Sequence, residues 1–227
     1  MQMVMRDMLF INWAVDTDAA RRFVDSRLEL DTVIDSGGKR MAFASAVCFR
    51  VDEVRSSVVP LPRLSFEQVN YRIYVKAEDV PSVVFLDMKV NSRMVTTLTS
   101  FLGVPVSYAD INISPKPAGA ESLRYVFESS GLNADVVVGG EAFVPDPAIE
   151  PLFITHRLVG YARAGESTYK LDVQHPLLDA IPARVDGIEA STLVELGLLT
   201  AEESRRPHSA MYVREALFGT SPPTRAW

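Results

Sequence analysis

Phe66-Glu67-Gln68-Val69-Asn70-Tyr71-Arg72-Ile73-Tyr74-Val75 is the stretch that decides the fold. It is rich in β-branched and aromatic residues, which favour strands. Side chains alternate across a strand, so one face carries a mainly apolar set: Glu67, Val69, Tyr71, Ile73 and Val75. The other face carries Phe66, Gln68, Asn70, Arg72 and Tyr74. We predict a strand over residues 65–76 that places an arginine between an amide and a phenol.

Arg72 is the most informative residue of this strand, because a buried guanidinium must be paired and hydrogen-bonded. In one explanation it pairs with an internal acid, either Glu67 turned inward by a bulge or Asp87 on the next strand. In the other, Arg72 lines a cavity with Asn70 and Tyr74 and receives the carboxylate or carbonyl of a small ligand. Arginine suits that role because its planar fork binds a carboxylate through two hydrogen bonds. Physics alone favours the structural role slightly, and both explanations stay open here.

The rest of the chain reads mostly as strands joined by turns. Strands are predicted at residues 9–15, 28–34, 40–51, 83–89, 123–128, 134–138, 153–163, 169–174 and 209–214. Helical spacing occurs after residues 16–17, at residues 94–102 and at residues 190–199. Strand-rich chains of this length usually close into a barrel or a strongly curved sheet, which hides their edges.

Length and composition describe an ordinary globular chain. It has 227 residues, of which 48% are hydrophobic and 23% charged. That length suits one large core with at most a small appendage. We predict one domain at residues 1–190 and a C-terminal extension at residues 191–227 that packs on it. Exposed sheet edges and the apolar tail favour a homodimer.

Charge and cysteine content exclude several classes of protein. The net charge of −6 and the pI near 5.2 argue against nucleic acid as a partner, since phosphate binding needs clustered basic residues. Cys48 is the only cysteine, so neither an internal disulfide nor a thiolate zinc cluster can form. No apolar stretch approaches the ~18–20 residues of a membrane helix. We expect a cytoplasmic protein that has no membrane partner.

The familiar catalytic and cofactor motifs are absent from the sequence. There is no GxGxxG, GxxxxGK[ST], GxSxG or HExxH pattern. The three histidines, His156, His175 and His208, are far apart, whereas a catalytic metal site needs several converging ligands. We therefore expect neither a metal nor a cofactor.

Three stretches resemble a known family: FEQVNYRIYV at 66–75, VPSVVFLDMKVNS at 80–92 and LGVPVSYADI at 102–111. A weaker second block is PLFITHRLVGYAR at 151–163 followed by LDVQHPLLDA at 171–180. These resemble the uncharacterised YqjF-like bacterial proteins of the acetoacetate-decarboxylase-like superfamily. The resemblance implies an α+β, mainly β fold. Its curved antiparallel sheet would close into a cone-like barrel around a cavity, with a few helices outside.

The resemblance does not extend to the decarboxylase's nucleophile. In that enzyme a cavity lysine forms a Schiff base with a β-keto acid, and a second lysine beside it depresses its pKa. The pair directly follows a proline after the equivalent helix. Here Val106 and Ser107 follow Pro105, and no lysine occurs between Lys89 and Lys116. The comparison therefore implies the fold without the Schiff-base route.

The second block supplies further candidate residues. Arg157 and Tyr161 match the family's Arg and Tyr, although both could serve only to brace the barrel wall. His175-Pro176-Leu177 keeps the histidine of the family's His-Pro-aromatic motif and loses the aromatic residue.

We expect a protein that binds a small organic acid or carbonyl compound in a barrel cavity. The ligand-binding candidates are Asn70, Arg72, Tyr74, Arg157 and Tyr161. The catalytic candidates are Glu67, as a general base if burial raises its pKa, and His175. One alternative is an enzyme that uses lyase-like or hydratase-like general acid/base chemistry in the same cavity. The other is a non-catalytic structural or interaction protein whose interior is filled by side chains.

Overall fold

The computed structural model describes residues 1–34, 37–55, 64–101, 103–118, 122–141 and 152–227. Its strands belong to one large sheet, whose path runs β15-β12-β11-β6-β5-β4-β1-β14-β13-β10-β9-β8. The chain is therefore mainly β, as predicted. Pairing is antiparallel except between β11 and β6 and between β6 and β7, so the expectation of an all-antiparallel sheet was too simple.

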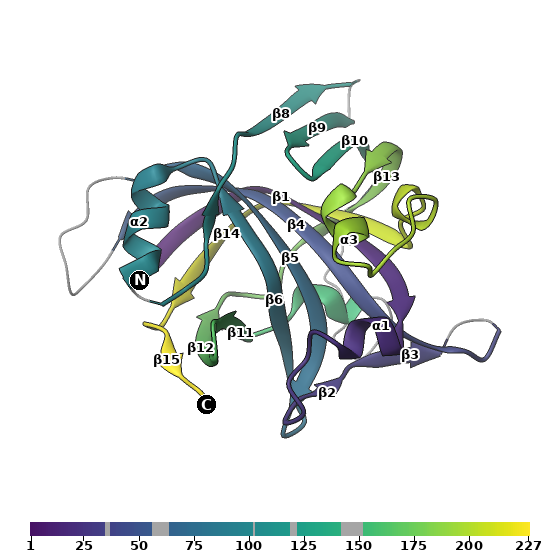
Figure 1. The fold of residues 1–227 in the computed structure, drawn as a ribbon. Coiled ribbons are helices and arrows are strands. Elements are labelled where there is room, and N and C mark those ends of the chain that lie inside the picture. The colour runs from purple at the N-terminus through teal and green to yellow at the C-terminus, as the bar shows by residue number, and fades with distance from the viewer. Residues whose placement is uncertain (35–36, 56–63, 102, 119–121, 142–151) are drawn as a thin grey trace.

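Seven strands, called the ring strands here, return on themselves through their pairings. They are β1 (Gln2–Asp16), β4 (Arg40–Arg55), β5 (Phe66–Ala77), β6 (Val80–Val90), β11 (Val159–Ala164), β12 (Ser167–Gln174) and β14 (Ser209–Thr220). Each pairs with the next, and β12 also pairs with β14 through Val173–Thr220 and Gln174–Gly219. In Figure 1, β1, β4, β5 and β6 are seen as long, strongly curved ribbons.

Four further strands, the side sheet, extend from β14. They are β13 (Ala180–Glu189), β10 (Leu132–Val138), β9 (Leu123–Ser129) and β8 (Ile111–Pro117). They occupy the upper part of Figure 1. The short strands are β2 (Glu29–Leu30), β3 (Thr32–Ile34), β7 (Ser107–Tyr108) and β15 (Thr224–Arg225).

The helices are short (Figure 1). They are α1 (Thr17–Arg21), α2 (Arg93–Phe101) and α3 (Ser191–Glu195), with 3-10 turns η1 (Leu152–Thr155) and η2 (Glu203–Arg205). Asp16 caps α1, since its side chain accepts hydrogen bonds from the backbone nitrogens of Asp18 and Ala19. In the described residues, no helix has the length and apolar character needed to cross a membrane.

Alternation along the ring strands produces two apolar clusters. On the outer face, residues such as Trp13, Cys48 and Tyr71 pack against side-sheet residues, including Phe127. On the opposite face, called the inner face here, side chains of non-neighbouring strands pack together: Phe10, Val47, Tyr74, Met211 and Phe218. The β5 strand, predicted from its alternation, therefore contributes to both clusters.

Two local predictions were wrong. The strand predicted at residues 153–163 begins only at Val159, because residues 152–155 form the turn η1. The apolar stripe predicted for the helix at residues 94–102 is mostly solvent-facing, since Val95 is buried but Phe101 is 84% exposed. Leu102, the last residue of that stripe, lies outside the described residues.

Candidate functional site

Arg72 lies on the inner face of β5 and is partly buried. Its Nε and Nη2 donate hydrogen bonds of 3.1 and 2.9 Å to the hydroxyl oxygen of Tyr74, and Nη2 also donates to the Ile154 carbonyl at 3.1 Å. Its guanidinium carbon is 5.4 Å from the centroid of the Phe10 ring. Within the described part of the chain Arg72 makes no ion pair with Glu67, Asp87 or any other acid. The explanation based on an internal acid partner is therefore wrong for those residues.

A chain of buried polar side chains fixes the Tyr74 hydroxyl. It lies 2.8 Å from the Ser45 hydroxyl, which donates to Asn12 Oδ1 at 2.5 Å. Asn12 Nδ2 in turn donates to the hydroxyl of Ser209 at 3.1 Å. Asn12 and Ser45 have no solvent exposure. This polar row crosses β14, β1, β4 and β5, and it ends at Arg72.

Arg157 approaches the same tyrosine from the loop between η1 and β11. Its guanidinium carbon is 5.2 Å from the Tyr74 ring centroid, and that of Arg72 is 5.1 Å from it. Arg157 Nη1 lies 2.7 Å from Asp31 Oδ2, and their side chains are 2% and 13% exposed. Lys76 Nζ lies 3.4 Å from the other oxygen of Asp31. Two cations, Arg157 and Lys76, thus share one carboxylate, and Arg72 lies against the same tyrosine, so the net charge of these four residues is positive.

His175 follows β12 and lies beside this group. Its ring centroid is 4.7 Å from that of Phe218 and 5.5 Å from that of His156. Burial lowers the pKa of His175, the Pro176 carbonyl acts in the opposite direction, and the charges of His156 and Arg72 lower it further. The charge of Arg72 thus acts on His175, although the two residues are distant in sequence.

Asn70 lies two residues before Arg72 on the same face of β5. Its Oδ1 accepts a hydrogen bond of 2.6 Å from Gln68 Nε2. Arg72, Tyr74, Arg157, His175 and Asn70 together form what we call the inner-face group.

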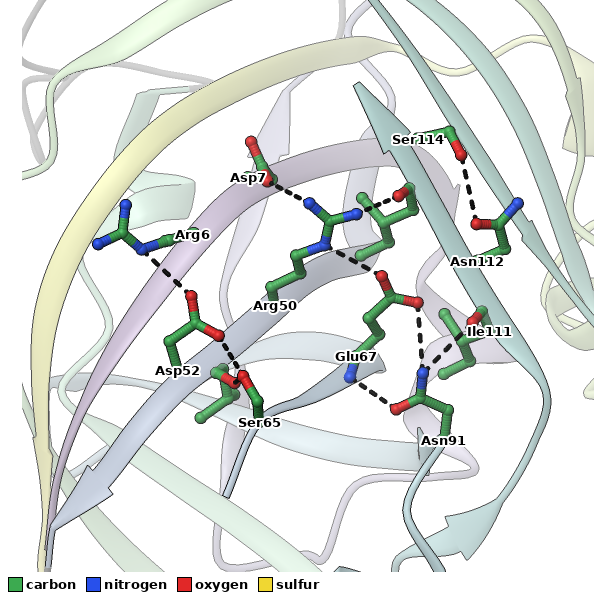
Figure 2. Close-up of polar contacts among 12 residues, drawn as sticks. Arg6, Asp7, Arg50, Asp52, Ser65, Glu67, Asn91, Ile111, Asn112 and Ser114 are labelled. Carbon is green, nitrogen blue, oxygen red and sulfur yellow. Dashed lines mark hydrogen bonds and ion pairs between the residues drawn. The ribbon is translucent and has the colours of Figure 1, made fainter. Parts of the chain in front are cut away.

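Glu67 lies elsewhere, on the outer face, in the network that Figure 2 shows. Its Oε1 accepts a 3.0 Å hydrogen bond from Arg50 Nε, and its Oε2 accepts one of 3.3 Å from Asn91 Nδ2. Arg50 Nη1 also pairs with Asp7 at 3.1 Å, and its Nη2 donates to the carbonyl of Ile113 on β8. The network thus joins the ring strands to the side sheet. It does not place Glu67 with Arg72.

Tyr161 is also separated from the inner-face group. It belongs to the outer cluster, where its ring stacks on Trp227 with centroids 5.3 Å apart. Two surface pockets, of about 370 and 400 Å³, contain none of the sequence-predicted site residues. In the part of the chain that is described, no three His, Cys, Asp or Glu residues are grouped to hold a metal.

Sequence reasoning missed Asn12, Ser45 and Asp31, which hold Tyr74 and Arg157. Ser45 lies directly opposite Arg72 in the β4–β5 pairing, and Asn12 lies opposite Ser45 in the β1–β4 pairing. The available signal was that Asn12 and Ser45 are polar residues at inner-face positions of the otherwise apolar strands β1 and β4. That signal becomes readable only when the strand register is known.

Comparison with solved structures defines the class of fold. A structure of acetoacetate decarboxylase aligns with a TM-score of 0.64 at 13% identity, covering 99% of this chain and 89% of that one. An acetoacetate-decarboxylase-like enzyme from Sphingomonas wittichii RW1 aligns at 0.61 and 9% identity, over 99% and 92%. The enduracididine biosynthesis enzyme MppR complexed with pyruvate aligns at 0.62 and 14% identity, over 99% and 89%. The fold is therefore acetoacetate-decarboxylase-like.

Sequence comparison gives the family. Residues 2–216 match DUF2071, described as an uncharacterized conserved protein, and the chain belongs to this family. The uncharacterized protein YqjF of Bacillus subtilis (strain 168) is 30% identical over 114 residues. That match spans 49% of this chain and 45% of YqjF, less than half the length of either. The resemblance seen in the sequence is thus confirmed.

Proposed function

We propose that this protein binds a small organic acid on the inner face of the ring strands, which enclose a cone-like barrel cavity. One observation carries the proposal: Arg72 is partly buried, yet its described hydrogen-bond partners are the neutral oxygens of Tyr74 and Ile154. Its Nη1 makes no hydrogen bond within the described residues. A guanidinium with a free donor and no carboxylate partner is suited to bind an anion.

The surroundings of Arg72 support an anionic ligand. Arg157 and Lys76 share Asp31, so that carboxylate does not neutralise Arg72 as well. In a partly desolvated site this excess positive charge attracts a carboxylate more strongly than it would in water. Pyruvate is the ligand in the MppR complex, which has the same fold.

In this proposal, Arg72 and Asn70 contact the ligand, and His175 borders it. Tyr74 and Arg157 hold the site in shape. Glu67 and Tyr161, both predicted as site residues, are left out, because Glu67 is bound to Arg50 and Tyr161 is stacked on Trp227.

We also propose that binding involves no Schiff base. Among the lysines, Lys89 lies on the outer strand face, where its Nζ is 3.4 Å from Asp87 Oδ2. Lys76 is ion-paired to Asp31 at the rim of the inner-face group. Borohydride reduction in the presence of acetoacetate or pyruvate, followed by intact-mass measurement, is expected to leave the protein unlabelled. A stable adduct on any lysine would refute this part of the proposal.

Calorimetric titration with pyruvate, acetoacetate and related acids tests the binding site. Arg72→Gln is expected to weaken binding by more than ~1.5 kcal/mol, the scale of a hydrogen bond to a charged group. Arg72→Lys keeps the charge without the fork, so a smaller loss is expected. Arg163→Gln is the control, because Arg163 is exposed and, among the described residues, its side chain donates to the Gly165 carbonyl alone.

If Arg72→Gln lowers the unfolding temperature but leaves affinity unchanged, Arg72 is structural. Native mass spectrometry of protein purified from its own cells gives an independent check, since a co-purifying acid is detected directly.

A second candidate is an enzyme that uses general acid/base chemistry at the same place. The observation that favours it is the lowered pKa of His175, which keeps its imidazole neutral and able to accept a proton. Conversion of a bound acid by the native protein, lost in His175→Phe, would support this function over simple binding.

A further inference from the structure

We infer that the ligand carries a hydroxyl group beside its carboxylate, which makes it a small hydroxycarboxylate. The inference deepens the proposed function and rests on it. It follows from the hydrogen-bonding atoms of the inner-face group that the protein itself leaves available.

Tyr74 has no proton to offer a ligand. Asn12 Oδ1 only accepts, so Ser45 donates its single hydroxyl proton to it. The contact of 2.8 Å between Ser45 and Tyr74 must then be a hydrogen bond from the Tyr74 hydroxyl to the Ser45 oxygen. The Tyr74 oxygen in turn accepts two hydrogen bonds from Arg72. Tyr74 is therefore a positioning residue and does not donate to the ligand, contrary to the sequence prediction.

Two donor groups remain on β5. Arg72 Nη1 makes no hydrogen bond within the described residues. Asn70 uses its oxygen to accept from Gln68, so its amide nitrogen is the end left for a ligand. Both groups donate only, which matches a carboxylate, whose oxygens only accept.

His175 supplies an acceptor. Its Nδ1 lies 2.7 Å from the Pro176 carbonyl oxygen, and a carbonyl only accepts, so Nδ1 carries the proton. The neutral ring then presents an unprotonated Nε2, which forms no hydrogen bond with any residue in the described ranges. A simple carboxylate or a ketone has no proton for this nitrogen, whereas a hydroxyl group does.

Residues 154–156 link the acceptor His175 to the donor Arg72. The Ile154 carbonyl receives Arg72 Nη2, and His156, two residues later, packs its ring edge-on against His175 at 5.5 Å. In this inference, Arg72 holds the carboxylate of a short ligand and His175, on which the Arg72 charge acts, receives its hydroxyl group.

Calorimetric titration with two matched series tests the inference: lactate, pyruvate and propionate, then 3-hydroxybutyrate, acetoacetate and butyrate. We expect the hydroxy acid of at least one series to bind about fivefold or more tighter than its two partners, the effect of one hydrogen bond. His175→Phe keeps a ring against Phe218 and removes the acceptor. It is expected to abolish that preference, so that the hydroxy acid and its unsubstituted partner bind the variant about equally.

The outcomes separate the two proposals. If all members of both series bind equally, or if the hydroxy preference survives in His175→Phe, the hydroxyl inference is overturned and the anion site stands. If none of the six acids binds to the native protein, both are overturned. A thermal unfolding curve for His175→Phe shows that the variant is folded.

Discussion

Arg72 donates two hydrogen bonds to the hydroxyl oxygen of Tyr74, which lies two residues later on the same face of β5. Both residues belong to β5. The position of the Tyr74 hydroxyl is fixed by a hydrogen bond with Ser45 on the neighbouring strand β4. The orientation of the cation that we propose for ligand binding therefore depends on a residue that need not touch the ligand.

Tyr74→Phe removes that acceptor and tests this dependence. Of the hydrogen bonds that Arg72 makes to described residues, the one to the Ile154 carbonyl would remain, so we expect affinity for small acids to fall about fivefold to tenfold and stability to fall by about 1–2 kcal/mol. Calorimetry and urea unfolding measure the two effects. Tyr161→Phe is the matched control, because its ring stacks on Trp227 in the outer cluster. Equal affinity in Tyr74→Phe and the native protein would show that Arg72 needs no positioning.

Asp31→Asn removes a carboxylate that pairs with the buried Arg157 guanidinium. Because removing one partner of a buried ion pair exposes the cost of burying the other, we expect a loss of about 3 kcal/mol in the free energy of unfolding. Glu202→Gln breaks an ion pair whose side chains are 77% and 74% exposed, so its expected loss is under about 1 kcal/mol. Urea unfolding of both variants checks the contrast, and similar losses would contradict it.

Glu67→Gln distinguishes a catalytic carboxylate from a structural one. We expect stability to fall by about 1–2 kcal/mol, because Arg50 loses one of two ion-pair partners. Affinity for small acids is expected to stay within about twofold, since Glu67 faces away from Arg72. A tenfold loss of affinity in a fully folded variant would show that Glu67 contributes to ligand binding.

The lowered pKa of His175 predicts a dependence of stability on pH. Because the folded state holds this proton less tightly than the unfolded state does, the unfolded chain binds more protons at mildly acidic pH. The contribution of His175 is complete above the unfolded pKa of roughly 6.5 and is lost as pH falls through that value toward the lower folded pKa. Unfolding free energies measured from pH 8 to pH 5 should therefore decline less steeply in His175→Phe. Parallel curves would contradict the assignment.

Strong local patterns made much of the fold predictable. The alternation in residues 66–75 correctly predicted β5, and the sequence resemblance correctly indicated the acetoacetate-decarboxylase-like fold. Two strands of the side sheet were missed for a physical reason. Strand β8 contains Pro115 and Pro117, and β13 contains Pro182 and Gly187, residues that argue against a strand when read alone. Strand β8 lies at the end of the sheet path, and a strand at a sheet edge tolerates proline.

The site was less predictable than the fold, because its contacts cross strands. Arg72 and Tyr74 are two residues apart, and local alternation places them together. Asn12 and Ser45 reach them only through the registers of β1–β4 and β4–β5. The separation of Glu67 from Arg72 did follow from alternation, and the sequence interpretation overrode it by allowing a bulge.

The pairing between β12 and β14 is the shortest among the ring strands. It has two residue pairs, whereas the pairing between β1 and β4 has twelve. Its last pair, Gln174 and Gly219, immediately precedes His175 and follows Phe218. Transient separation of β12 from β14 costs less free energy than separation of the strands with longer pairings. Amide protons of this pairing should therefore exchange with solvent early. Local opening at this pairing would change the surroundings of His175 and would leave the hydrogen bonds of the polar row from Ser209 to Arg72 intact.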